Sequence, residues 1–364
     1  TYGNQRFRIA AEPVLVVLAA LGAVALVDWL RRGRPRPVDG NEESTAEGSA
    51  ARNERLEGLR AVAAFAVVGT HIGFASGATF RSDLGAYLAR MDIGGAIFFV
   101  LSGYLLLRPF VRADLAGQPP PRVLAYLWRR GLRIVPAYWL ALLAIPLLLG
   151  ITKIRSVADL VIYGGFLQIY DHDRALSGIT QAWSLCTELS FYVFLPLYAA
   201  ALRRTGARRL RAHVVGLVVL YAASVVFRAW LEVAEPSIAP IAWAWLPANA
   251  DLFALGMAVA LVETAVPLGA VRSFVERHGR WCLPAALAVF WFVSTQLGLP
   301  RGLEDATAAR ELARHLLYGV VGVLAVAPLA LRARRDHLGA VLGWRPVVWL
   351  GAISYGIYVW HLDV

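Results

Sequence analysis

Residues 59–72 read LRAVAAFAVVGTHI, an apolar stretch that holds two ionisable side chains, Arg60 near its start and His71 near its end. An offset of eleven residues on an α-helix makes three turns, so both side chains share one face and lie about 16 Å apart along the axis. Ionisable groups are costly inside a membrane and mark functional sites there. This stretch therefore predicts a transmembrane helix with a functional face. A purely structural hydrogen bond between helices would also account for His71.

Apolar stretches recur along almost the whole chain. The protein has 364 residues, of which 58% are hydrophobic, and its mean hydropathy is +0.57. Stretches of about 17 to 25 apolar residues are long enough to cross a bilayer as helices. The sequence therefore predicts an all-α, polytopic membrane helix bundle of about ten spans, at residues 12–30, 57–75, 93–110, 133–150, 182–202, 212–232, 241–263, 281–298, 313–332 and 344–364.

The formal net charge of +11 comes from arginines that gather in short loops between the apolar stretches. Such clusters mark the cytoplasmic loops of membrane proteins, so the expected partner is the lipid bilayer and not nucleic acid. The clusters alternate correctly only if residues 157–170 do not cross the membrane. This segment is also short for a span. We therefore expect it to form one short re-entrant or interfacial helix.

Composition divides the chain into three parts. Residues 1–30 are predicted to carry an extra N-terminal transmembrane helix. Residues 31–54, rich in Pro, Gly, Ser and charge, are predicted to form a flexible cytoplasmic linker. Residues 55–364 are predicted to form the main transmembrane domain. The two cysteines, Cys186 and Cys282, have no Cys or His neighbour at metal-ligand spacing, so no metal site is predicted.

A carboxylate stands inside the apolar stretch at residues 182–202. Ser184, Glu188 and Tyr192 recur every four residues, which puts a hydroxyl, a carboxylate and a phenol on one stripe of a helix. A charge buried there needs a partner from another helix, and His71 or an arginine is the natural candidate. A carboxylate that holds a histidine is the usual arrangement for a general base. The structural alternative is a Glu–Arg pair that only locks helices together.

A second cationic group stands at a predicted helix entrance. Arg130 and Arg133 are three residues apart and face the same way, a geometry suited to gripping phosphates. Contact with anionic lipid would explain the pair equally well. The polar stripe of Ser354, Tyr358 and His361 near the chain's end offers either membrane-interface anchoring or a substrate contact.

These motifs together resemble those of the membrane-bound acyltransferase family 3, whose bacterial members acylate carbohydrates and related acceptors. The resemblance covers about residues 55–364. It is carried, in the family's order, by RLEGLR at 55–60, His71, FFVLSGY at 98–104, WRRGLRIVPAYW at 128–139, WSLCTELSFY at 183–192 and ISYGIYVWH at 353–361. Each motif is short, but their order makes the signal specific.

The resemblance implies an enzyme of the bacterial cytoplasmic membrane. It would transfer an acetyl or other short acyl group from acyl-CoA, its donor substrate, to a hydroxyl of an extracytoplasmic carbohydrate or glycolipid, without a permanently bound cofactor. The implied catalytic residues are His71 and Glu188, and the implied donor-binding residues are Arg60, Arg130 and Arg133. Supporting or substrate-contacting roles are implied for Ser102, Trp183, Ser184, Tyr192, Tyr355 and His361.

The expected mechanism has His71, oriented by Glu188, either removing the acceptor's hydroxyl proton or taking the acyl group itself. Ser184, Tyr192 or Arg60 would donate to the developing oxyanion. The chain departs from many family members at Ala96, Ile97 and Asn249, where those members carry Asp or Arg, so the acceptor's identity stays open.

Three other functions are compatible with the same residues. A transporter or flippase could use Arg60, His71 and Glu188 as a polar relay, although no internal repeat or pair of broken spans accompanies them. A catalytically inactive scaffold is a further alternative. The acceptor could also be a lipophilic natural product that enters from the bilayer.

Overall fold

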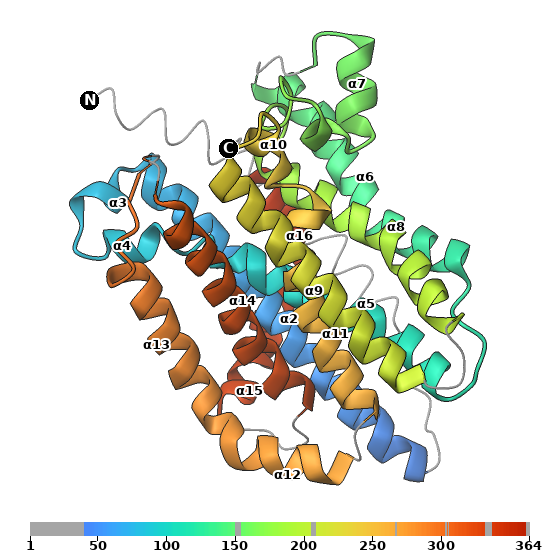
Figure 1. Cartoon of the computed structure of the whole chain (residues 1–364). Helices are drawn as coiled ribbons and strands as arrows, with labels where there is room; N and C mark the ends of the chain where they lie inside the picture. Colours follow the sequence, from blue (N-terminus) through green and yellow to red (C-terminus); the bar gives the residue numbers. More distant parts are fainter. Residues whose placement is uncertain are drawn as a thin grey trace.

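The computed structural model describes residues 40–149, 154–204, 209–265, 268–302, 304, 306–331 and 337–361. Within these ranges the regular elements are all helices, which confirms the all-α class. The long helices run beside one another as a bundle (Figure 1). The predicted first span, at residues 12–30, lies outside the described residues.

The bundle is built mainly from long helices, joined by short ones. The long helices are α2 (Gly40–Ala75), α5 (Ile93–Leu115), α6 (Val123–Leu149), α8 (Trp183–Arg203), α9 (Arg209–Ala234), α11 (Ala250–Ala265), α13 (Cys282–Thr295), α14 (Ala308–Leu331) and α16 (Arg345–Trp360). The shorter α-helices are α3 (Ala78–Arg81), α4 (Gly85–Leu88), α7 (Val157–Gly164), α10 (Ala239–Ala242), α12 (Leu268–His278) and α15 (His337–Leu342).

The bundle has two distinct ends. Helices α3, α4, α7 and α10 lie at one end, here called the α7 end, and α12 and α15 lie at the opposite end, called the α12 end (Figure 1). Arginine-rich connections meet at the α12 end. There Arg203 at the end of α8 lies 3.3 Å from Asp114 of α5, and His213 of α9 lies 2.9 Å from the same carboxylate. These contacts agree with the predicted grouping of arginine-rich loops on one side.

Within the described residues, six helical segments are long and apolar enough to cross a membrane. This supports a multi-helix membrane protein but not the predicted number of about ten spans. Helices α11, α13 and α16, where three further spans were predicted, have 16, 14 and 16 residues. The six segments are Glu54–Ala75, Gly85–Leu115, Val123–Leu147, Thr180–Arg203, Arg209–Ala234 and Ala308–Leu331.

The structure agrees with the prediction for one connecting segment and differs from it for another. Helix α7 has eight residues, so it rises only about 12 Å, too little to cross a bilayer. The prediction that this segment does not cross as a helix is therefore confirmed. Helix α2 begins at Gly40, so the predicted flexible linker is wrong for residues 40–54. Residues 41–54 contain several Glu and Ala and no Pro, and this helix propensity outweighs their low hydrophobicity.

Helices α5 and α11 form the centre of the bundle, and two glycines let their backbones approach closely. A Cβ at Gly103 of α5 would meet the backbone of Phe253, and a Cβ at Gly256 of α11 would meet the carbonyl of Val100. Close approach through small residues is how helices associate where lipid removes the hydrophobic driving force. Phe253 also stacks on Phe99 and Phe191, with ring centroids 4.7 and 4.1 Å apart.

We expect Gly256→Val to lower the free energy of unfolding by at least about 1–3 kcal/mol, because the new side chain must push α5 and α11 apart. Thermal unfolding in detergent would measure the change. Gly131→Ala on α6 is the matched control, since a Cβ there has no heavy atom within 4 Å. Equal stability of the Gly256→Val variant and the wild type would contradict the close approach.

Candidate active site

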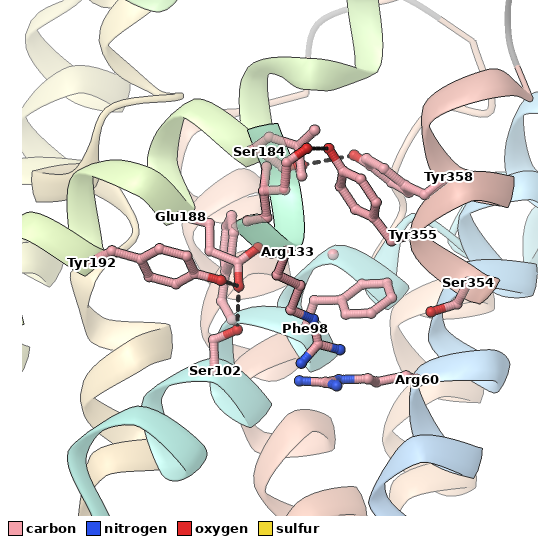
Figure 2. Close-up of a pocket in the computed structure, with 14 residues that line it drawn as sticks. Arg60, Phe98, Ser102, Arg133, Ser184, Glu188, Tyr192, Ser354, Tyr355 and Tyr358 are labelled. Atoms are coloured by element: carbon pink, nitrogen blue, oxygen red, sulfur yellow. Dashed lines mark hydrogen bonds between the residues drawn. The ribbon is translucent and has the colours of Figure 1, made fainter. Parts of the chain in front are cut away.

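A cavity lies between helices α2, α5, α6, α8 and α16 (Figure 2). Its walls combine aromatic and apolar side chains with a small set of charged and hydroxyl groups. This composition is typical of a ligand site. The lining residues are Arg60, Gly95, Phe98, Phe99, Ser102, Arg133, Ile134, Ser184, Leu185, Glu188, Tyr192, Ser354, Tyr355 and Tyr358.

Helix α8 supplies the polar stripe that the sequence predicts. Ser184, Glu188 and Tyr192 all line the cavity, so the four-residue spacing does place them on one face. Thr187, next to Glu188, instead bonds to the carbonyls of Trp183 and Ala244, and so ties the opposite face of α8 to the rest of the bundle. The predicted stripe is confirmed.

The carboxylate of Glu188 is held from two helices. The hydroxyl of Ser102 on α5 donates to Glu188 Oε1 at 2.7 Å, and the phenol of Tyr192 on α8 donates to the same oxygen at 2.8 Å (Figure 2). Hydrogen bonds to a charged group are stronger than neutral ones. Ser102 therefore has a part in the site, and the Ser–Gly step at residues 102–103 is not only a packing device.

Two guanidinium groups face this carboxylate across the cavity. The side chains of Arg60 on α2 and Arg133 on α6 lie side by side and point into the cavity (Figure 2). Both share Glu57, whose Oε1 lies 2.7 Å from Arg60 Nη1 and 4.0 Å from Arg133 Nη2. Two arginines that share one nearby ion-pair carboxylate form a site suited to a phosphate or carboxylate group. Arg130 does not line the cavity.

The other part of the cavity is built from hydroxyl groups. Tyr358 on α16 donates its hydroxyl hydrogen to the carbonyl of Gln181 at 2.9 Å, and its oxygen lies 2.7 Å from Ser184 Oγ. Tyr355, one of the predicted supporting residues, donates to the carbonyl of Ile134 at 2.8 Å and so ties α16 to α6. The cavity therefore runs from paired arginines to a buried pair of hydroxyls.

The structure contradicts the predicted contact between His71 and Glu188. His71 Nδ1 lies 2.8 Å from His361 Nε2, whereas the carboxylate of Glu188 accepts a hydrogen bond from Ser102 on α5. The reason is the three-turn spacing itself. Because Arg60 shares the cavity with Glu188, a residue about 16 Å further along α2 is out of reach of that carboxylate. Glu188 therefore faces arginines, which was the other partner that the sequence allowed.

Two further predicted site residues lie elsewhere. Trp183 is absent from the cavity lining and packs edge-on against Trp243 and Phe99, with ring centroids 4.6 and 6.3 Å away. His361 lies beyond the cavity, and its ring centroid is 5.6 Å from that of Tyr358. Tyr358 thus connects the cavity to the histidine pair. The sequence places Tyr358 in the polar stripe with Ser354 and His361, and the structure shows that Ser354 and Tyr358 line the cavity.

A polar, charged cavity inside an apolar helical bundle characterises a membrane protein that handles a polar substrate. A family profile described as an acyltransferase domain, that of acyltransferase family 3, matches residues 53–362. The chain therefore belongs to this family, as its motifs indicate.

Three relatives extend this assignment. YrhL of Bacillus subtilis (strain 168) is provisionally named a peptidoglycan O-acetyltransferase. It is 27% identical over 85% of this chain and 48% of its own length. The peptidoglycan O-acetyltransferase OatA of Listeria monocytogenes serovar 1/2a is 24% identical over 85% of the chain and 49% of its own length. Nodulation protein 10 of Rhizobium leguminosarum bv. viciae is 24% identical over 74% of this chain and 71% of its own length.

The chain thus spans about half the length of the first two relatives. No solved structure matches the chain significantly.

The hydroxyls of Ser102 and Tyr192 should each contribute about 1.5–3 kcal/mol to stability, because each donates to a carboxylate. Ser102→Ala and Tyr192→Phe should therefore lower the unfolding temperature in detergent, and less than additively in combination, since they share one oxygen. Tyr198→Phe on the same helix is the matched control, because that buried hydroxyl has no hydrogen-bond partner. Equal effects of Tyr192→Phe and Tyr198→Phe would contradict the assignment.

Proposed function

We propose that the protein is an O-acyltransferase of the bacterial cytoplasmic membrane. It moves an acetyl or other short acyl group from cytoplasmic acyl-CoA to a hydroxyl of an extracytoplasmic carbohydrate or glycolipid. The observation that carries the proposal is the cavity, which joins an arginine pair to buried hydroxyls next to a histidine pair. The names of two relatives, which specify peptidoglycan O-acetylation, support a carbohydrate acceptor and an acetyl group.

The donor enters from the α12 end, which we take as cytoplasmic because arginine-rich loops gather there. Its phosphates bind Arg60 and Arg133, whose guanidinium groups already face the cavity. Glu188 and Glu57 keep these cations in place while the site is empty. Arg130 acts from outside the cavity, by long-range attraction to the incoming anion.

The reaction takes place at the opposite part of the cavity, near Tyr358. The acceptor's hydroxyl oxygen attacks the thioester carbonyl carbon, the new C–O bond forms and the C–S bond breaks. His71 removes the hydroxyl proton, and this proton passes to the departing CoA sulfur. The three turns between Arg60 and His71, about 16 Å, leave room for the extended arm that separates the phosphates of CoA from its thioester. The hydroxyls of Ser184 and Tyr358 line this part of the cavity, and the Ser184 hydroxyl would have to turn from Tyr358 to donate to the developing oxyanion.

Family membership favours this reaction over the transporter and scaffold alternatives. The outer position proposed for the chemistry suits an extracytoplasmic acceptor. A lipophilic acceptor remains the competing substrate class, and an acceptor panel that contains peptidoglycan fragments, glycolipids and apolar alcohols separates the two.

We expect His71→Ala to lower acceptor-dependent release of CoA from acetyl-CoA by about 10²–10⁴-fold, the usual contribution of a general base. The assay uses purified protein in nanodiscs and follows the free thiol. His172→Ala, a change of the same kind at an exposed position in the loop before α8, should leave the rate unchanged. Full activity of a well-folded His71→Ala variant would refute the proposed mechanism.

Arg133→Gln and Arg60→Gln should raise the KM for acetyl-CoA by about ten- to a hundredfold, the equivalent of losing one charge-assisted hydrogen bond. Arg211→Gln, at an exposed position early in α9, is the matched control. Titration of binding with acetyl-CoA and with a dephosphorylated analogue would reveal whether the phosphates make the contact. An unchanged KM in both variants would remove the arginine pair from the donor site.

A further inference from the structure

The histidine pair lies where two helices end. His71 is on the last turns of α2, and His361 directly follows α16. His71 Nδ1 and His361 Nε2 are 2.8 Å apart, and His361 Nδ1 lies 2.7 Å from the carbonyl oxygen of Tyr358. Three polar groups therefore form one chain of hydrogen bonds that leads from a backbone carbonyl to His71.

The chemistry of this chain determines where its protons are. A carbonyl oxygen only accepts, so His361 Nδ1 must carry a hydrogen and donate it to Tyr358. If the ring of His361 is neutral, its lone pair is then on Nε2, which faces His71. His71 Nδ1 must accordingly donate, and the lone pair of His71 is on Nε2. A backbone oxygen thus selects the tautomer of both rings in turn.

We propose that His361 is a positioning residue that holds His71 with Nε2 as its basic nitrogen. This inference rests on the proposed function, in which His71 is the base. His361 takes the part that the sequence analysis assigned to Glu188, because an imidazole lone pair can accept the Nδ1–H bond as a carboxylate would. When His71 Nε2 takes the acceptor's proton, the Nδ1–H bond to His361 becomes charge-assisted and stronger.

Charged side chains of the segments that follow α2 have contacts of their own among the described residues. Asp92, just before α5, is one of these side chains. It is itself engaged by Arg314 at 3.0 Å and by the hydroxyl of Tyr318 at 2.6 Å. Arg81 donates to backbone carbonyls just after the end of α2, and Arg90 donates to the carbonyl of Pro300. His361 is thus the side chain that bonds directly to the His71 ring.

Substitutions at His361 test the inference in the full chain reconstituted in nanodiscs. His361→Phe keeps a ring but removes the acceptor, whereas the side-chain carbonyl of His361→Gln can still accept from His71 Nδ1. We expect His361→Phe to lower kcat about 10–100-fold, to leave the KM for acetyl-CoA unchanged and to shift the pH–rate profile. His361→Gln should retain at least tenfold more activity than His361→Phe. His172→Gln, at an exposed loop position, should behave as the wild type.

The nitrogen signals of His71 give a readout that does not depend on activity. In protein with ¹⁵N-labelled histidine, assigned by comparison with His71→Ala, we expect the wild type and His361→Gln to show a protonated Nδ1 and an unprotonated Nε2. In His361→Phe the signals should move toward the opposite tautomer. If His361→Phe does not fold, the pattern in His361→Gln alone decides, since a protonated Nε2 there would overturn the inference.

The outcomes separate this inference from the proposed function. Wild-type kcat and an unchanged tautomer in His361→Phe would overturn the positioning role and leave the transferase intact. Equal losses in His361→Phe and His361→Gln would overturn it as well, because the acceptor at residue 361 would then not matter. Full activity of His71→Ala would refute the proposed function, while the ¹⁵N pattern would still report on the pair.

Discussion

The constraint on which the structure depends is that a charged or polar side chain inside an apolar bundle needs a partner from a neighbouring helix. Water is not there to solvate it, and each unpaired group costs several kcal/mol. Glu263 of α11 meets this need with Arg108 and Arg112 of α5, at 2.8 and 3.1 Å. Asp251 does so with His315 of α14 at 2.8 Å. Such pairs fix which helices are neighbours and at what level, and the close approach of α5 and α11 then follows from small residues.

The cavity differs from these buried ion pairs between helices in how its charged side chains are paired. At Glu263 two arginines and the hydroxyl of Tyr104 surround one deeply buried carboxylate. In the cavity Arg60 and Arg133 share Glu57, and Glu188 is tied to hydroxyl groups by its Oε1. Cations that face open space have an excess of hydrogen-bond donors, and an anionic ligand is the natural complement. The need of a buried charge for a partner therefore stabilises the fold, and it also distinguishes a binding site from an ion pair that only holds helices together.

The arginine pair and the histidine pair lie at different depths of the bundle, so the two ends of the site differ chemically. Arg60 and His71 lie three turns apart on α2, so under the proposed function phosphate binding and proton transfer occupy different depths of the bundle. Tyr358 links the two, since it lines the cavity and its ring lies beside His361. A transferase that takes its donor from one side of a membrane and its acceptor from the other needs such a separation. A soluble enzyme with both substrates in the same solvent does not.

The sequence by itself determined the all-helical class, the helix at residues 59–72, the short α7 segment, the stripe of Ser184, Glu188 and Tyr192, and the family. These follow from periodicity, apolar length and motif order, which are local properties. It did not determine the helical extension of α2 from Gly40, where local propensity competes with polar composition. Only the tertiary structure decided that Glu188 bonds to Ser102 and Tyr192 while His71 bonds to His361. Helical spacing fixes which face a residue occupies, but the partner depends on the relative depth of two helices, and packing sets that depth.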